Sequence, residues 1–181
     1  MSFFLLTLGG AKWDKVHQKE GLMERRVTTE MQELLNAGAF VGNYTHSLDG
    51  KKRVTIPSDW REAAGNPVLF VMPGLNEKCL YVVTAREMAQ RLEKVRAASV
   101  ANVQAQKLLR HFFSRADRVA LDAQGRIRVK DELLDYAGII NQMVLVGVGS
   151  RFELWSPESW NEQNSQLDQS KFAEAVQYIG F

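Results

Sequence analysis

One spacing of charged residues occurs twice in the sequence and gives its clearest indication of chemistry. Asp49 and Arg53 recur 73 residues later as Asp122 and Arg126. An aspartate in a polar, glycine-containing stretch favours a tight turn, because its carboxylate accepts hydrogen bonds from main-chain N–H groups further along the chain. We therefore interpret Asp49, Asp122 and Gly125 as residues that set two turns, with an arginine leaving each turn.

Further cationic residues stand beside both arginines. Lys51 and Lys52 precede Arg53, whereas Arg126, Arg128 and Lys130 alternate and so share one face of a strand. A two-stranded β-ribbon fits the DNA major groove, where arginine can donate two parallel hydrogen bonds to guanine. DNA binding is one hypothesis, and arginines that merely decorate exposed strands are the alternative. The candidate DNA-binding residues are Lys51, Lys52, Arg53, Arg126 and Arg128.

Catalytic and metal-binding patterns are weak by comparison. His17, His46 and His111 lack the spacing of metal ligands. Cys79 begins a predicted buried strand, which favours a packed thiol over a nucleophile. Gly147-Val148-Gly149 has no third glycine and no following helix start, so we predict a hairpin turn rather than a phosphate cradle. Four carboxylates lie in predicted loops or helices, where they need no partner but solvent: Glu77, Asp131, Glu132 and Asp135. Four tryptophans favour packing over a role as stacking platforms: Trp13, Trp60, Trp155 and Trp160. We predict no enzyme, no metal and no cofactor.

Composition sets the broad class of protein. The chain has 181 residues, 45% hydrophobic and 24% charged, as in soluble globular proteins. Its longest apolar runs, Phe3–Leu6 and Met143–Val146, are far below the roughly 20 residues that span a bilayer. With one cysteine and no secretory pattern, we expect a cytoplasmic protein without a membrane or small-molecule partner. The net charge is +2, and residues 89–115 hold six positive side chains and one negative, a run typical of a solvated helix face.

An internal repeat predicts the elements that must position the charged residues. Leu48–Val54 aligns with Leu121–Ile127, and Ala64-Gly65 aligns with Ala137-Gly138. Each copy is about 45 residues, too small to bury a core alone, so we expect the two copies to pair around an approximate two-fold axis.

Each copy is predicted to be strands with one short helix. In the first copy, Ser58 or Asp59 is expected to cap the helix, which Gly65 ends. A helical stretch from Thr84 to about Phe113, broken near Ser99, joins the copies, and helices near 157–166 and 170–178 follow. The predicted strands and short helices are Tyr44–Leu48, Arg53–Ile56, Trp60–Ala64, Val68–Met72 and Cys79–Val83, then Arg126–Val129, Asp131–Ala137, Met143–Val146 and Phe152–Trp155.

These residues resemble the MraZ family, bacterial transcription regulators that contain two SpoVT–AbrB units. The resemblance covers residues 40 to 160, about two thirds of the chain. In the first half the matching residues are Phe40-Val41-Gly42, His46-Ser47-Leu48-Asp49, Arg53-Val54, Ile56-Pro57 and Arg61. In the second half they are Leu121-Asp122, Gln124-Gly125-Arg126-Ile127, Tyr136-Ala137-Gly138, Val144-Leu145-Val146-Gly147, Arg151-Phe152-Glu153-Leu154-Trp155-Ser156 and Trp160.

The resemblance implies a fold and a function. The fold is α+β, mainly β: a pseudo-two-fold AbrB-like β-barrel of the double swapped-hairpin type, made from two tandem repeats with a helical pair between and after them. The units are 43–88 and 116–160, with a helical linker at 89–115 and a helical tail at 161–181. The resemblance also implies a ring-shaped homo-oligomer in the nucleoid. It would bind short G-rich direct repeats in double-stranded DNA upstream of its own division and cell-wall operon and repress that operon, with Arg53 and Arg126 as DNA contacts.

Two departures from the family leave alternatives open. Lys52 stands where the family has glycine, so the first turn either uses Gly50 for left-handed backbone or gains an extra cation against phosphate. Residues 1–39 are either a true extension with a helix over Glu30–Ala37 or the result of a mis-called start, with Met23 or Met31 as initiator. Trp13-Asp14 can only be encoded by TGG followed by GAT or GAC, which contains TGGGA and raises the hypothesis that the extension is translated operator DNA.

A second class of function also stays open at this stage. The AbrB-type fold also serves antitoxin-like modules that bind proteins, and such binding depends on apolar surface rather than on counterion release.

Overall fold

The computed structural model describes residues 39–97, 102–165, 176 and 178. No helix in these ranges is long and apolar enough to cross a membrane. Several predictions lie outside the described residues: the N-terminal extension with its helix over Glu30–Ala37, the break near Ser99, and most of the helix at 170–178. All the described residues belong to one unit of the chain, Ala39–Phe181.

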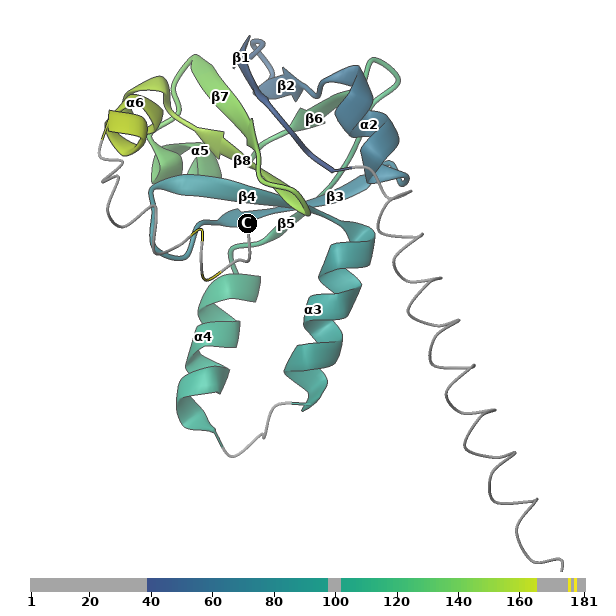
Figure 1. The fold of residues 1–181 in the computed structure, drawn as a ribbon, viewed down its shortest axis with the longest axis vertical. Helices are drawn as coiled ribbons and strands as arrows, with labels where there is room; N and C mark the ends of the chain where they lie inside the picture. Colours follow the sequence, from purple (N-terminus) through teal and green to yellow (C-terminus); the bar gives the residue numbers. More distant parts are fainter. Residues whose placement is uncertain (1–38, 98–101, 166–175, 177, 179–181) are drawn as a thin grey trace, which may run out of the picture. The chain divides into compact units, whose positions relative to one another are not determined.

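The two copies contain the same elements in the same order (Figure 1). The predicted strands and short helices are confirmed, with bounds that differ by at most two residues. The first copy holds β1 (Asn43–Ser47), β2 (Arg53–Thr55), α2 (Ser58–Ala64), β3 (Val68–Pro73), β4 (Cys79–Thr84) and α3 (Ala85–Ala97). After α4 (Val103–Phe113), the second copy holds β5 (Asp117–Ala120), β6 (Arg126–Arg128), α5 (Asp131–Ala137), β7 (Gln142–Gly147), β8 (Arg151–Trp155) and α6 (Pro157–Ser165).

Side-chain caps start two of the predicted helices. The Thr84 hydroxyl accepts a 3.2 Å hydrogen bond from the Glu87 N–H at the start of α3. The Ser156 hydroxyl accepts one of 3.1 Å from the Ser159 N–H at the start of α6. The predicted cap of α2 is wrong, because this helix begins at Ser58 itself and no side chain caps it. Pro57 takes the N-cap position, from which its fixed φ leads directly into the helix.

The strands pair between the copies as well as within them. A six-stranded antiparallel sheet has the order β1-β7-β8-β4-β3-β5, so the first strand of each copy joins the hairpin of the other copy. The separate two-stranded ribbon pairs β2 with β6. Repeat-equivalent residues face each other at the centre of both arrangements: Val54 opposite Ile127, and Tyr81 opposite Glu153. An approximate two-fold axis therefore passes through the ribbon and the middle of the sheet.

The predicted barrel does not close. In the described residues, the sheet keeps β1 and β5 as its edges, and the β2–β6 ribbon forms a ladder of its own. Each ribbon strand has three residues, with an aspartate turn before it and a proline or a helix soon after it. The architecture is therefore an open sheet covered by a short ribbon, α+β and mainly antiparallel.

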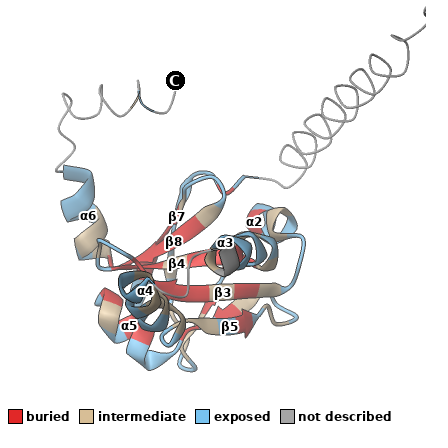
Figure 2. Cartoon of the chain, turned by 90° about the horizontal axis from the view of Figure 1, so that it is seen from below, coloured by how far each residue is buried: buried red, intermediate tan, exposed pale blue. Residues whose placement is uncertain are grey.

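Alternation along the strands divides the apolar residues between the two sides of the sheet. The main core lies between one sheet face and the layer made by β2, β6, α2 and α5. On the other face, α6 packs through Trp160 near Trp155, and α4 packs through Phe112 and Phe113 near Met72. Figure 2 shows the burial of the central strands. The largest fully buried side chains are Trp60, Phe40, Phe152, Ile56, Leu69, Met72, Leu80, Ile127, Leu134, Met143, Leu145 and Leu154.

Gly147 is expected to tolerate no side chain. A Cβ there would overlap the Phe40 carbonyl and the Val41 nitrogen, in the segment that brings Phe40 into the core against Trp60 and Phe152. We predict that Gly147→Ala lowers the free energy of unfolding by about 1–3 kcal/mol, measured by urea denaturation.

Gly50→Ala is the matched control, since a Cβ at Gly50 meets no atom within 4 Å and its φ is not in the left-handed region. This variant should change stability by no more than about 0.5 kcal/mol. Equal stability of the two variants would contradict the packing argument.

Candidate nucleic-acid interface

The two aspartates close their turns in the same way. Asp49 Oδ1 accepts 2.9 Å hydrogen bonds from the N–H groups of Lys51 and Arg53. Asp122 Oδ1 accepts from the N–H groups of Gln124 and Arg126, at 2.9 and 3.0 Å. One oxygen of each carboxylate is thus used to fix main chain, which is the geometry of an Asx turn.

The second carboxylate oxygen holds the arginine that leaves the turn. Asp49 Oδ2 lies 2.8 Å from Arg53 Nε and 2.7 Å from its Nη2. Asp122 Oδ2 lies 2.9 Å from Arg126 Nε and 2.8 Å from its Nη2. The hydrogen bond from each arginine side chain, with those from the main chain, lowers the pKa of both carboxyl groups from 3.8 to about 2. Both carboxylates therefore stay ionised at neutral pH.

The ribbon brings the two turns together into one Asp–Arg cluster, made of Asp49, Arg53, Asp122 and Arg126. Arg53 Nη1 lies 3.5 Å from Asp122 Oδ2, and Arg126 Nη1 lies 3.7 Å from Asp49 Oδ2. Each guanidinium thus forms a close ion pair with the aspartate of its own turn and a longer one with the aspartate across the axis. The residues of each cross-copy contact are far apart in sequence, so their spacing does not predict the contact. The contacts form only because β2 pairs with β6.

The outer face of the ribbon is cationic. Val54 and Ile127 are fully buried, so the residues that alternate with them face away from the core. Arg53 pairs with Arg128 in the ladder, and the side chain of Arg128 is 64% exposed against 28% for Arg53 and 23% for Arg126. The structure therefore brings Arg53, Arg126 and Arg128 onto one surface, with Lys51 exposed and Lys52 half-buried in the first turn.

The left-handed position of the first turn falls on Lys52. Its φ is 58°, and the equivalent Gly125 has a φ of 73°. Gly50 lies outside the left-handed region, so the alternative that the first turn uses Gly50 is wrong. A side chain with a Cβ in this conformation costs on the order of 1 kcal/mol relative to glycine.

Arg61 of α2 lies against the second turn. A Cβ on Gly125 would overlap the Arg61 guanidinium, so the glycine leaves the space that this side chain occupies. The repeat equivalent of Arg61 is Leu134, which is buried. The first turn thus carries two added cations, Lys51 and Lys52, and the second turn has Arg61 beside it. The sequence prediction did not include Arg61 among the DNA-binding residues, although its family match was a signal.

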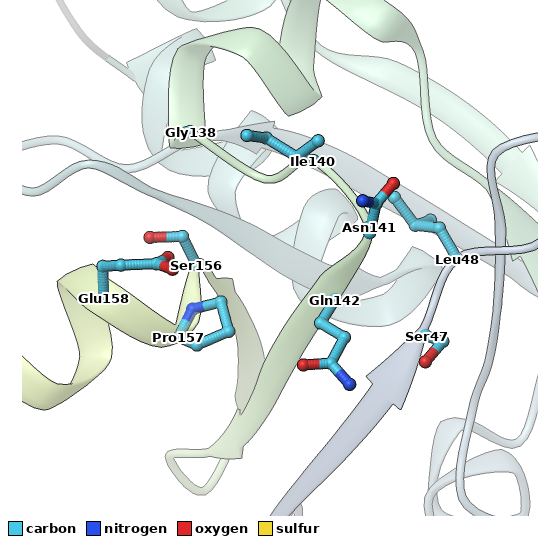
Figure 3. A pocket seen from close by; sticks show the side chains of 9 residues that line it. All are labelled: Ser47, Leu48, Gly138, Ile140, Asn141, Gln142, Ser156, Pro157 and Glu158. Atoms are coloured by element: carbon cyan, nitrogen blue, oxygen red, sulfur yellow. The ribbon is translucent and has the colours of Figure 1, made fainter.

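An open pocket near the start of α6 extends to Ser47 and Leu48, which directly precede the first aspartate turn. Its volume is about 880 Å³, and Figure 3 shows the side chains that surround it. They are Ser47, Leu48, Gly138, Ile140, Asn141, Gln142, Ser156, Pro157 and Glu158. None of these residues is cationic, so the pocket does not offer a phosphate site.

Three possible metal ligands lie together in the described residues, with Cys79 and Glu153 buried and Glu77 half-buried. Donor atoms of Glu77, Cys79 and Glu153 lie within 4.8 Å of one another. Glu153 accepts hydrogen bonds from Arg151 at 2.8 Å and from Trp155 Nε1 at 3.1 Å. Burial, and then the nearby carboxylates, raise the pKa of the Cys79 thiol, so it stays protonated. The packed-thiol prediction is confirmed. The prediction that Glu77 needs only solvent is wrong, because burial beside Glu153 raises its pKa.

Comparison with known proteins gives one consistent result. Residues 39–111 and 112–178 each match the family model described as "MraZ protein, putative antitoxin-like". The relatives include proteins named "Transcriptional regulator MraZ" from Clostridium acetobutylicum (39% identical), Clostridium tetani (35%) and Alkaliphilus metalliredigens (33%). Each alignment covers 78% of this chain and 99% of the relative.

Replacing Lys52 by glycine should stabilise the protein. Lys52→Gly removes the left-handed strain, and we expect the free energy of unfolding to rise by about 1 kcal/mol, measured by thermal or urea denaturation. Lys52→Ala is the control, because alanine removes the charge but keeps the Cβ. A gain of the same size in both variants would show that the charge, not the backbone, is responsible.

The Asp–Arg cluster should make stability depend on acid pH. The pKa of Asp49 and Asp122 is about 2 in the folded protein against an ordinary 3.8, so their contribution is complete above about pH 4. It should be lost as the pH falls from 4 towards 2. Urea unfolding from pH 7 down through this range measures the effect. The double variant Asp49→Asn/Asp122→Asn should have a lower free energy of unfolding than the wild type at pH 7, and this free energy should fall by less on acidification. Parallel pH profiles for the two proteins would contradict this account.

Proposed function

The chain belongs to the MraZ family, and on that premise we propose that it is a sequence-specific DNA-binding transcriptional regulator. Its relatives carry the name of transcriptional regulators, so the chain is a regulator and not an enzyme. We further propose that residues 43–88 and 116–160 are two SpoVT–AbrB-like units, with a linker at 89–115 and a tail at 161–181.

This proposal rests mainly on which side of each arginine guanidinium is bonded to the aspartate. A guanidinium has five N–H donors on two usable edges. In Arg53 and Arg126, the carboxylate pairs with the Nε–Nη2 edge. Among the described residues, the Nη1–Nη2 edge has only the contacts of 3.5 and 3.7 Å across the axis. That edge has the spacing to chelate O6 and N7 of guanine in the major groove while the aspartate keeps the arginine in place.

The surrounding cations are suited to phosphate. Lys51, Lys52 and Arg128 flank the Asp–Arg cluster, and Arg61 adds a charge beside the second turn. Contacts of this kind position a protein on the duplex but carry no sequence information. We assign them to the DNA backbone and leave base readout to Arg53 and Arg126.

A single subunit with a net charge of +2 would bind DNA weakly. We propose a ring-shaped homo-oligomer in which neighbouring subunits engage successive G-rich direct repeats as one multivalent ligand. Repeats near one helical turn apart, about 10 base pairs, would present every site on one face of the duplex. The proposed setting is the cytoplasm and nucleoid, and the proposed target is the protein's own division and cell-wall operon, which it would repress.

Fluorescence anisotropy on the duplex upstream of the gene tests base readout. We expect Arg53→Ala and Arg126→Ala each to weaken binding by about 1–3 kcal/mol, roughly five- to 150-fold, with little change on a base-scrambled duplex. Arg110→Ala is the charge-matched control, since Arg110 is exposed on α4, and α4 lies on the other side of the sheet from the ribbon (Figure 1). Equal losses in all three variants would leave only a nonspecific basic surface.

The same titrations at two salt concentrations separate DNA from a protein partner. DNA binding should weaken steeply as salt rises, because phosphate contacts release counterions. Salt-insensitive binding to a protein, with no preference for the native duplex, would favour the antitoxin-like alternative.

Asp49→Asn distinguishes positioning from simple charge. Removing a negative charge from a DNA-binding face should tighten binding if only charge matters. If the carboxylate orients Arg53 for guanine, the variant should instead bind the native duplex more weakly while its affinity for scrambled DNA is unchanged or higher. Tighter binding to both duplexes would contradict the positioning role.

A further inference from the structure

The helices α3 and α4 leave the sheet side by side and enclose a groove that the proposed DNA-binding surface does not use (Figure 1). This α3–α4 groove has a volume of about 270 Å³, and its lining is apolar except for Arg91 and Lys94. Leu75 and Leu108 line it and are 56% and 55% exposed. An exposed apolar groove of this kind is typical of an interaction surface.

The helices that form the groove are strongly cationic. Residues 89–115 hold six positive side chains and one negative. Arg91 is paired with Glu87 at 2.8 Å. Four other cations on or next to these helices are exposed and form no ion pair among the described residues: Lys94, Lys107, Arg110 and Arg115. The groove therefore favours an acidic occupant, and it disfavours the same groove of another molecule because like charges would then meet.

The same chain carries a surface of the opposite character. Ile140, in the loop between α5 and β7, is 73% exposed, and it lines the open pocket together with Pro157 and Glu158 (Figure 3). Residues 131–165 hold six negative side chains and one positive. We call this surface the Ile140 face. In the part of the chain that the structure describes, three of its acidic residues are exposed and form no ion pair: Glu132, Asp135 and Glu158.

The groove and the Ile140 face belong to different sides of the sheet. The helix α5, which precedes Ile140, packs in the main core on the ribbon side, whereas α4 packs on the other side. One subunit can therefore use its groove towards one neighbour and its Ile140 face towards the next. A head-to-tail contact of this kind is heterologous, and it closes into a ring when the rotation between subunits allows it.

We propose that the α3–α4 groove binds the Ile140 face of a second copy of the chain. Ile140 contacts the apolar side chains of the groove, and the acidic residues around it face the cations of α3 and α4. This inference names the interface of the proposed ring-shaped homo-oligomer and rests on that part of the proposed function. It does not depend on base readout by Arg53 and Arg126.

Four matched substitutions in the full-length protein test the interface. Leu108→Asp and Ile140→Asp each place a carboxylate in the apolar contact, which is costly to bury. Each should raise the protein concentration needed for half-assembly by roughly tenfold or more, measured by size-exclusion chromatography with light scattering. The controls are Val103→Asp and Val41→Asp, at positions that are 61% and 65% exposed and line neither the groove nor the pocket beside Ile140.

The controls should assemble as the wild type does. All four positions are exposed, so all four variants should keep a urea midpoint close to that of the wild type. A monomeric wild type, or normal assembly of Leu108→Asp or Ile140→Asp, would overturn the proposal.

Mixing the two disruptive variants tests the head-to-tail arrangement. The Leu108→Asp chain keeps an intact Ile140 face, and the Ile140→Asp chain keeps an intact groove. Each should be monomeric alone, whereas an equal mixture should form a dimer of one chain of each kind, since one intact contact is restored and both outer surfaces stay blocked. A mixture that remains monomeric would overturn the proposal.

The outcome is separable from that of the DNA-binding proposal, because these variants leave Arg53 and Arg126 unchanged. The mixed dimer should still prefer the native duplex to the scrambled one in the anisotropy titrations. A dimer that forms as expected but shows no such preference would support this interface and contradict base readout alone.

Discussion

The antiparallel pairing of β2 with β6 is the contact on which the arrangement of the charged residues depends. Val54 and Ile127 face each other there with no exposed surface, which anchors the ribbon to the core. The pairing holds the two aspartate turns next to each other and directs both arginines outward. Without it, each turn would still close on its own aspartate, but the contacts across the axis at 3.5 and 3.7 Å could not form. The candidate interface therefore belongs to the pair of copies.

The two copies have diverged, and each has added positive charge near its turn from a different source. The first turn carries Lys52 in a strained left-handed conformation, and the second carries Gly125 with Arg61 lying against it. Leu134, the equivalent of Arg61, is buried. The added positive charge thus comes from the turn itself in the first copy, and from a helix of the other copy at the second turn. The two halves could therefore differ in how they approach a duplex even though their arginines have matching carboxylate contacts.

The sequence predicted local elements well, since period-two alternation, turn residues and helix caps are all properties of short segments. The order of strands, the short helices and the caps at Thr84 and Ser156 follow from such signals. Pairing between copies is a property of the whole fold, so the open sheet and the cross-axis ion pairs could not be predicted from spacing. The α2 cap was mispredicted because Pro57 competes with Ser58 for that position. The raised pKa of Glu77 depends on Glu153, which is distant in sequence.

The charges of the interface divide into two roles if the proposed function holds. The two aspartates cancel the two arginines of the Asp–Arg cluster, so this centre contributes geometry and little net attraction. Attraction must then come from Lys51, Lys52, Arg61 and Arg128 around it. Counterion release should govern the contacts of these outer cations, whereas the guanine contacts depend on how firmly each carboxylate holds its arginine. Affinity and sequence preference would therefore reside in different side chains of one small surface.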